Sequence, residues 1–412
     1  MQTRVVVTGL GVISAAGVGT QALAAALRRG RSAIRQIESP SDSGGPGIGG
    51  RVDGLEGLDV LPRRLARRLD RSALLFASAA QMALEASGVL ERPLDRSAVG
   101  VFEGSSLAGL GRALDEQRTL LERGAERLSV QALTAAMTGA GGGALSILHG
   151  LRGPVVAVSS GCVSSACALG AALDQIRLGE VDVAIAGGGE APLHPTVLAL
   201  FHRAGLLASK PAEPERACRP FARDRDGTVL AEGGAALVLE ALPHAVRRGA
   251  QIRAELRAVA LTNEAASLVA PAADAVERAR AITRVLQKAR AGAEEVEYVA
   301  AHGTATLSND KQETLAIKKG LGERARRVPV CAMKSGLGHT LGASTALELI
   351  GTLLAMQGGF VPPTLNLDDP DPECDLDYVP RFAREASVGL ALVNAAGFGG
   401  RNASLLVERW AT

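Results

Sequence analysis

Short apolar runs rich in valine and alanine alternate along this chain with alanine-rich segments that have a helical period. Such alternation predicts an α/β protein whose mixed sheets are covered by helices. Loops are predicted at residues 41–50 and 209–219. The predicted strands cover residues 4–8, 155–159, 181–186, 235–239, 298–301 and 328–331, and the predicted helices cover residues 71–87, 166–178, 274–289 and 343–356.

The composition indicates a core built from small side chains. Aromatic residues make up only 2% of the 412 residues, whereas 49 are glycine, so alanine, valine and leucine must fill closely spaced layers. A chain of this length suits two packed units or one large duplicated domain. Residues 4–11 and 296–303 each begin a run of strand, glycine turn, helix and strand, which hints at duplication.

Several classes of protein are disfavoured. A formal charge of +2 gives no general reason to expect nucleic acid, and no apolar run reaches the roughly 18 residues that span a bilayer. No targeting segment is visible, and five scattered cysteines without a CxxC pair argue against disulfides and structural zinc. We therefore expect a cytoplasmic protein without a metal.

A dinucleotide site is also disfavoured. Gly9-Leu10-Gly11 follows a predicted strand, but Ser14 occupies the position of the third glycine of the fingerprint. No acidic residue closes a clear second strand about 20 residues further on. The phosphate-binding pattern GxxxxGK[ST] does not occur.

Cys162 is the first candidate for a catalytic group. It follows a strand and a Ser-Gly turn and opens an alanine-rich helix, as a nucleophile does at a sharp strand-to-helix turn. Backbone N–H groups and the helix dipole at that position favour a thiolate, so a lowered pKa is expected. The alternative is a small buried hydrophobic residue, which is what most free cysteines are.

Two histidines follow strands in glycine-rich contexts. His302 begins His-Gly-Thr-Ala-Thr, and His339 lies five residues after Lys334 in Lys-Ser-Gly-Leu-Gly-His. A single histidine after a strand is usually structural. Two such placements in a chain with six histidines favour side chains presented in one cleft.

Together these motifs resemble the β-ketoacyl synthases, elongating condensing enzymes of the thiolase superfamily with a Cys-His-His triad. The likeness extends from Val5 to Val407. Further matching residues and motifs are Asp310, Glu313, Glu348, Cys218-Arg-Pro-Phe-Ala-Arg-Asp-Arg-Asp-Gly227, Pro362-Pro-Thr-Leu-Asn-Leu and Asn394-Ala-Ala-Gly-Phe-Gly-Gly-Arg-Asn402.

The resemblance implies a five-layered αβαβα thiolase sandwich built from two related halves. Residues 1–245 would carry the nucleophile and residues 246–412 both histidines, so the site would lie between the halves. The implied reaction is a decarboxylative Claisen condensation. An acyl chain on Cys162 reacts with a malonyl-carrier thioester and gives a 3-oxoacyl product, with no bound cofactor because carrier phosphopantetheine delivers the substrates.

The resemblance also implies roles for single residues. His302 and His339 would stabilise the enolate oxygen or assist decarboxylation. The backbone N–H groups of Cys162 and Phe398 would form the oxyanion hole, where one donor is worth about 10²–10³ in rate. Lys334 would fix the geometry around the histidines, and Glu348 would pair with this lysine.

Other residues relate to the acyl substrate. Phe398 resembles a gating phenylalanine, and Leu107 matches a position that limits acyl-chain depth. Thr228 and Ala396 stand where relatives often carry phenylalanine, which would open space beside the gate. Gly161 replaces the usual alanine before the nucleophile. These departures favour a specialised polyketide, polyene or modified fatty acid as product.

The arginines within residues 61–71 are similar to a docking patch for an acidic acyl carrier protein. At helical spacing Arg64, Arg67, Arg68 and Arg71 would share a face, and a solvated helix face is the alternative. A homodimer, or a heterodimer with a chain-length factor, is the expected assembly.

Two other functions compete with the condensing enzyme. A non-catalytic chain-length-factor-like subunit would lack the nucleophile that Cys162 supplies. A coenzyme A thiolase would need a second cysteine near Phe398, where this chain has Gly-Phe-Gly.

Overall fold

The computed structural model describes residues 2–38, 47–209 and 213–411. The strands on the main path of the large sheet are β1 (Val5–Ser14), β5 (Val99–Gly104), β6 (Val155–Val158), β7 (Val183–Glu190), β8 (Gly233–Ala241), β9 (Ala254–Asn263), β10 (Tyr298–Ala300), β11 (Val330–Cys331), β14 (Leu390–Gly397) and β15 (Arg401–Arg409). Short strands are β2 (Gly17–Val18), β3 (Arg35–Gln36), β4 (Ile48–Gly49), β12 (Phe360–Val361) and β13 (Arg384–Glu385).

The helices are α1 (Thr20–Arg29), α2 (Arg63–Ala66), α3 (Arg71–Ser87), α4 (Leu110–Arg123), α5 (Ala132–Ala135), α6 (Ala140–His149), α7 (Ser164–Leu178), α8 (Pro195–Arg203), α9 (Leu242–Arg247), α10 (Val276–Ala289), α11 (Leu307–Leu321), α12 (Lys334–Leu337) and α13 (Ser344–Gly358).

The strand order reveals two halves with the same topology. The main path runs β11-β10-β14-β15-β9-β1-β8-β7-β5-β6. In the first half, β1 pairs with β8 and β8 pairs with β7, both antiparallel. Strand β7 then pairs with β5, and β5 with β6, both parallel. In the second half, β9 pairs with β15 and β15 with β14, both antiparallel. Strand β14 then pairs with β10, and β10 with β11, both parallel. The halves join where Val6 and Val7 of β1 pair with Glu255 and Ala254 of β9.

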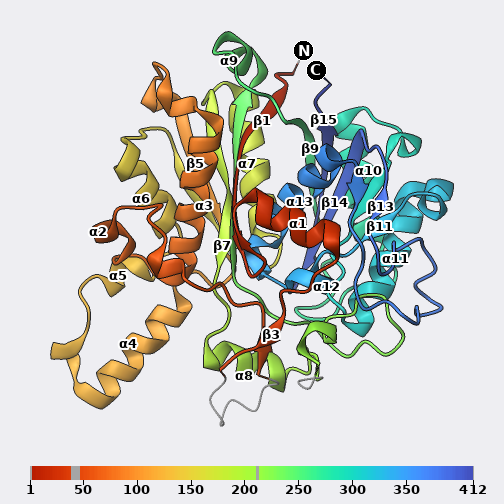
Figure 1. The fold of residues 1–412 in the computed structure, drawn as a ribbon, viewed down its shortest axis with the longest axis horizontal. Helices are drawn as coiled ribbons and strands as arrows, with labels where there is room; N and C mark the ends of the chain where they lie inside the picture. Colours follow the sequence, from red (N-terminus) through yellow and green to blue (C-terminus); the bar gives the residue numbers. More distant parts are fainter. Residues whose placement is uncertain (1, 39–46, 210–212, 412) are drawn as a thin grey trace.

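Helices complete a five-layered sandwich, as the resemblance implied (Figure 1). Helix α3 packs on β1, β8 and β7, and α10 packs on β9 and β15, so these helices cover the outer faces. Helices α7 and α13 contact each other and strands of both halves, and they form the central layer. In Figure 1 this layer lies between the orange and yellow left side and the cyan and blue right side.

Small residues allow α3 to lie unusually close to β1. A Cβ atom on Gly9 would stand 2.1 Å from the Ala83 carbonyl oxygen, and one on Gly11 would stand 1.9 Å from that of Ala79. Any side chain at these two positions would therefore push the helix away. The Gly-Leu-Gly motif near the N-terminus is explained by this helix–strand packing and not by a nucleotide.

Helix α3 begins where the sequence predicts. The Asp70 carboxylate accepts hydrogen bonds from the N–H groups of Ser72 and Ala73, which caps the first turn. At the other end Gly88 takes a left-handed conformation and ends the helix. The predicted helix at residues 71–87 therefore has the bounds of α3.

The other predicted elements are found with small shifts. All predicted strands overlap observed ones, and α7, α10 and α13 lie within two residues of the predicted helix bounds. The predicted loops at residues 41–50 and 209–219 lie partly outside the described residues. The predicted boundary between residues 245 and 246 falls within α9, which connects β8 to β9.

Two interpretations of the sequence were wrong. The strand at residues 298–300 is β10, which corresponds to β5 in the first half, so β9 and not residues 296–303 begins the second repeat. The arginines within residues 61–71 do not share one helix either, because α2 ends at Ala66 and α3 begins at Arg71. Arg71 pairs with the buried Glu232 and is not part of an exposed arginine face.

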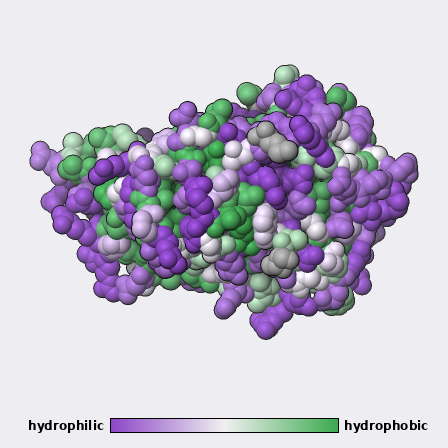
Figure 2. Space-filling view, turned by 90° about the horizontal axis from the view of Figure 1, so that it is seen from above, coloured by the Kyte–Doolittle hydropathy of each residue, from purple (hydrophilic) through white to green (hydrophobic). Residues whose placement is uncertain are grey.

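Within the described residues, no helix combines the length and the apolar character that a bilayer span requires. Figure 2 looks down on the face on which both chain ends lie, and hydrophilic residues there surround hydrophobic patches toward the middle and left.

Candidate active site

Cys162 lies in the tight turn between β6 and α7. Gly161 takes a φ of 59°, in the left-handed region that glycine enters without strain. The Ser164 hydroxyl closes the turn, because it donates to the Gly161 carbonyl at 2.6 Å and accepts from the Ser160 N–H at 2.8 Å. The cysteine is buried in this turn, with 8% of its surface exposed.

His339 brings a base to this thiol from the other half of the molecule. Its backbone N–H donates to the Val229 carbonyl at 2.7 Å, which fixes the segment after α12. Its Nε2 stands 3.2 Å from the Cys162 Sγ, and its Nδ1 stands 2.9 Å from the Ser344 Oγ. A nucleophile, a base and a group that orients the base are thus in line.

His302 follows β10 and faces the same space. The backbone N–H groups of His302 and Gly303 donate to the two carboxylate oxygens of Glu313 at 2.7 and 2.8 Å, so α11 holds this turn. The imidazole rings of His302 and His339 meet edge to face, with centroids 5.3 Å apart. Both rings therefore lie within reach of one small substrate group.

Lys334 supports His302 from behind. Its Nζ donates to the His302 carbonyl at 2.7 Å, stands 3.3 Å from the His302 Nδ1, and pairs with the Glu348 carboxylate. An ammonium group only donates hydrogen bonds, so Nδ1 must accept and the ring proton of neutral His302 must be on Nε2. Lys334 and Glu348 are both buried, as expected for a structural pair.

Burial dominates the electrostatics of the site. It lowers the pKa of His302 and of His339 well below the usual range, and the nearby Lys334 charge lowers both further, so both rings are neutral. Burial also raises the pKa of Glu348 to about 7, although Lys334 opposes this shift.

The expected activation of the thiol by a lowered pKa is wrong. Burial raises the pKa of Cys162 to about 12 and outweighs the attraction of the Lys334 charge. Helix α7 begins at Ser164, two residues after the cysteine. The thiol is therefore neutral at rest, and His339 Nε2 lies within hydrogen-bond distance of its sulfur.

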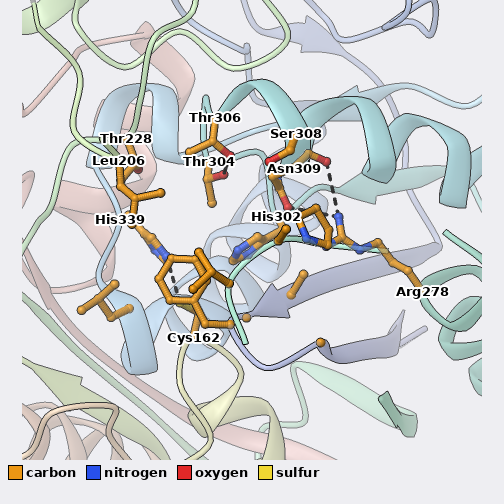
Figure 3. Close-up of a pocket in the computed structure, with 18 of the residues that line it drawn as sticks. Cys162, Leu206, Thr228, Arg278, His302, Thr304, Thr306, Ser308, Asn309 and His339 are labelled. Atoms are coloured by element: carbon orange, nitrogen blue, oxygen red, sulfur yellow. Dashed lines mark hydrogen bonds between the residues drawn. The ribbon is translucent and has the colours of Figure 1, made fainter. Parts of the chain in front are cut away.

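These groups open onto a cavity of about 200 Å³ (Figure 3). In Figure 3, Cys162 and His339 lie on one side and His302 near the centre, with Asn309 and Arg278 on the opposite side. One wall is polar and another apolar. The cavity is lined by Cys162, Phe201, Leu206, Thr228, Glu264, Val269, Ala270, Pro271, Arg278, His302, Thr304, Thr306, Ser308, Asn309, His339, Leu341, Ala396, Gly397, Phe398 and Gly400.

The predicted gate residues line this cavity. Phe398 is 41% exposed, and its ring centroid lies 6.4 Å from that of Phe201. Thr228 and Ala396 share the same lining. A Cβ atom on Gly397 would stand 3.1 Å from the Cys162 backbone nitrogen, so the chain just before Phe398 approaches the nucleophile closely.

Leu107 lies further from the cavity than the gate residues do. It does not line the cavity, but it packs against the apolar cluster that contains Cys162. The buried carboxylate of Glu190 holds its backbone. This carboxylate accepts from the N–H groups of Ser106, Leu107 and Gly342 at 2.6, 3.2 and 3.0 Å.

The predicted docking arginines lie outside the cavity. Arg64 is in α2, Arg67 follows its last residue, and Arg68 precedes α3. All are exposed. Among the described residues, no group of three or more His, Cys, Asp or Glu side chains could hold a metal ion.

Reasoning from sequence missed several groups. Ser344 orients His339, and only its position at the start of a helix five residues later signals this role. Phe201 beside the gate carries no motif. Arg278 and Asn309 line the cavity, but in the sequence Arg278 looks like the polar face of an amphipathic helix.

Comparison with known proteins gives matches over nearly the whole chain. The model of the β-ketoacyl synthase N-terminal domain matches residues 2–245, and that of the C-terminal domain matches residues 253–368. Nodulation protein E of Rhizobium sp. (strain N33) is 39% identical over 98% of this chain and 99% of its own. The 3-oxoacyl-[acyl-carrier-protein] synthase 2 of Synechocystis sp. (strain ATCC 27184 / PCC 6803 / Kazusa) is 37% identical over 99% and 98%.

Solved structures agree with these matches. A type II polyketide ketosynthase, bound to a hexaketide and in complex with its acyl carrier protein, superposes with a TM-score of 0.92 at 32% identity, covering 100% of both chains. The ishigamide ketosynthase/chain length factor superposes with a TM-score of 0.90 at 33% identity, again over 100% of both chains.

Proposed function

The chain belongs to the β-ketoacyl synthase family, and from this premise we propose that Cys162, His302 and His339 carry out its condensation reaction. The protein is a 3-oxoacyl-[acyl-carrier-protein] synthase acting in fatty-acid or type II polyketide synthesis. The contact of 3.2 Å between His339 Nε2 and Cys162 Sγ carries the assignment. A non-catalytic subunit has no need of this pair.

In the first step, His339 Nε2 takes the thiol proton as Sγ attacks the acyl thioester of the carrier. The new oxyanion is stabilised by the backbone N–H groups of Cys162 and Phe398, which the close approach at Gly397 brings together. When the intermediate collapses, the carrier thiol leaves with the proton from His339. The result is an acyl thioester on Cys162.

In the second step, a malonyl thioester places its carbonyl oxygen between the histidines. The C–CO2 bond breaks, CO2 leaves, and the electron pair forms an enolate whose oxygen accepts from His302 Nε2–H. His339 can donate to the same oxygen once its ring proton has moved from Nδ1 to Nε2, and the Ser344 hydroxyl, which also contacts Thr340, then donates to Nδ1. The enolate carbon then attacks the acyl carbonyl and the Cys162 thiolate leaves. The thiolate takes up one proton from solvent, which balances the loss of the carboxylate as CO2.

The substrates arrive on the phosphopantetheine of an acyl carrier protein, and these steps need no resident cofactor. Arg64, Arg67 and Arg68 are exposed at one end of α3, where they can meet an acidic carrier. The space beside Phe398 that Thr228 and Ala396 leave supports a specialised acyl chain.

The edge strand β6 supports assembly into a dimer, with a second copy or with a chain-length factor. It is the last strand of its half, and its residues are exposed or half-buried, with Val155 at 42%. Apolar side chains on an unpaired edge favour pairing with another chain. The exposed Leu133, Met137 and Ile147 in α5, α6 and the segment between them add apolar surface.

Intact mass spectrometry with acyl-pantetheine thioesters tests the nucleophile. The wild type should gain one acyl group, and the Cys162→Ala variant should gain none. Cys167 is the matched control, because it is the next cysteine along the chain, lies in α7 and is only half-buried. Equal labelling of Cys162→Ala, or loss of labelling in Cys167→Ala alone, would overturn the assignment.

The histidines can be separated by assaying the two steps independently. His302→Ala should still accept an acyl group but lose decarboxylation of the malonyl thioester. His339→Ala should also slow acyl transfer, because it removes the base for the neutral thiol. Normal decarboxylation in His302→Ala would contradict its role at the enolate oxygen.

A further inference from the structure

Arg278 is a buried cation on the polar wall of the cavity. It comes from the first turn of α10, and only 9% of its surface is exposed. Its Nε donates to the Asn402 side-chain oxygen at 3.2 Å, and its Nη1 donates to the side-chain oxygen of Asn309 at 3.1 Å. Figure 3 shows the guanidinium held beside Asn309.

The remaining nitrogen of this guanidinium has no fixed acceptor in the part of the chain that the structure describes. Among the described residues, none accepts a hydrogen bond from Nη2 of Arg278, although the residue lines the cavity. The Glu264 carboxylate lies on the Nε side, 3.7 Å away, and accepts from the Ala272 N–H and the Asn402 amide. Glu264 therefore holds Arg278 in place without covering Nη2.

Arg278 is also the single lysine or arginine among the described residues that line the cavity. Both histidines are neutral, and Lys334 lies behind His302 and is paired with Glu348. The Arg278 charge reaches the reacting groups, since it contributes to lowering the pKa of His302. An anion that enters this cavity meets one lysine or arginine, Arg278, whose Nε side faces the Glu264 carboxylate that lines the same cavity.

The two substrates of a condensing enzyme differ in charge. A saturated acyl thioester is neutral, whereas the malonyl thioester carries a carboxylate that must leave water to reach the histidines. Burying a carboxylate without a partner is costly, and a guanidinium offers it matched donors. The pantetheine amides are neutral, and the cavity also offers the hydroxyl groups of Thr304, Thr306 and Ser308.

We propose that Arg278 binds the free carboxylate of the malonyl extender through Nη2 and so selects the second substrate over the first. This inference rests on the condensing function proposed above. The ion pair exists while the carboxylate is bound, and it ends when the C–CO2 bond breaks and CO2 leaves as a neutral molecule. Arg278 thus contributes to binding and orientation and takes no proton or electron pair.

If Arg278 binds the malonyl carboxylate, substitution of Arg278 should change the KM for the malonyl substrate alone. Interactions made in the ground state and lost at the transition state raise KM when removed and leave kcat unchanged or higher. In Arg278→Gln, the KM for malonyl-pantetheine should rise about 10- to 100-fold, as expected for one lost charge-assisted hydrogen bond. Acylation of Cys162 by a saturated acyl-pantetheine should keep its rate.

The experiment compares Arg278→Gln, Arg278→Lys and Arg280→Gln with the wild type. Arg280 is the matched control, because it lies two residues along α10 and is exposed, with its charge paired to Glu277. Small pantetheine thioesters remove any effect of carrier docking. Competition by the malonyl thioester and by its carboxamide analogue gives a second readout, because the preference for carboxylate should disappear in Arg278→Gln and remain in part in Arg278→Lys.

Each other outcome counts against the proposal. Equal loss of acylation and of malonyl binding in both Arg278 variants would make the residue a support for the loops around the cavity. An unchanged KM, or an unchanged preference for carboxylate, would leave no role for its charge. Failure of the wild type itself to acylate or to decarboxylate would instead overturn the condensing function.

Discussion

At the scale of single residues, the Lys334–Glu348 pair is the most consequential buried contact behind the histidines. Both side chains are 2% exposed, so neither charge can turn to water when its partner is removed. Glu348→Ala should destabilise the fold by about 3–5 kcal/mol because it leaves an unpaired buried ammonium. Urea unfolding measures this loss.

A double variant separates charge from shape at this pair. Lys334→Met with Glu348→Leu replaces two buried charges by apolar groups of similar size, which is often neutral or stabilising. It should recover most of the free energy of unfolding and still lack decarboxylation. If the double variant were as unstable as Glu348→Ala, the charge argument would fail.

Glu103, a buried residue of β5, gives a residue-scale prediction about pH. Burial raises its pKa from 4.5 to about 8, against the hydrogen bond from the Gly142 N–H. The folded-state pKa lies above the unfolded one, so the stability that this group contributes is fully present below about pH 4.5 and is lost as the pH rises through about 8.

Glu103→Gln removes this titration and keeps the side-chain shape. Its free energy of unfolding, relative to the wild type, should increase by up to a few kcal/mol between about pH 5 and about pH 9. Urea unfolding of both proteins across this range provides the measurement. A difference that stays constant with pH would show that Glu103 does not titrate as stated.

At the scale of elements, the arginines before α3 can be tested apart from the chemistry. Charge reversal of Arg64, Arg67 and Arg68 should weaken carrier binding and make it less sensitive to salt, because exposed charges mainly set the association rate. Acylation of Cys162 by acyl-pantetheine should not change. Arg63, an exposed neighbour paired with Asp59, serves as the matched control.

Two results would contradict docking at these arginines. Equal losses of carrier-dependent and pantetheine-dependent acylation would mean that the arginines support the fold. No loss in either would mean that they form only a solvated surface.

The elements also show how far sequence can predict this structure. The helix predicted at residues 71–87 has the bounds of α3, which Asp70 caps and Gly88 ends. Strands β5, β9, β14 and β15 were missed. In β5 the buried Glu103 interrupts the apolar run, and β9 contains Arg257 and Thr262 within its length.

The candidate site was predicted by a different route. Cys162, His302 and His339 stand far apart in sequence, and resemblance, not periodicity, brought them together. The raised pKa of the thiol could not be foreseen, because it depends on burial between two halves of the molecule. The burial of Arg278 could not be foreseen either, because its position on the helix predicts exposure to solvent. Its partners Asn309 and Asn402 come from distant segments of the chain.

At the scale of the whole molecule, the open edge at β6 predicts self-association or pairing with a related chain. Val155→Lys should place a charge on this edge and shift the protein toward monomer. Light scattering over a range of concentrations gives the mass. Val246→Lys is the control, because Val246 is 62% exposed on α9. A variant at Val155 that associates as the wild type does would exclude β6 from the interface.

The carboxylate of Glu190 has a consequence for how such a protein can change over time. It accepts hydrogen bonds from the backbone N–H groups of Ser106 and Leu107. It also accepts one from Gly342 of the other half, near the histidine that faces the nucleophile. The side chain at position 107 takes no part in these hydrogen bonds. If the side chain at this position limits acyl-chain depth, as the resemblance implies, mutation there would change the acceptable chain length while the reacting groups keep their places. Mutation could then change the range of acyl substrates in this fold without changing the residues that react.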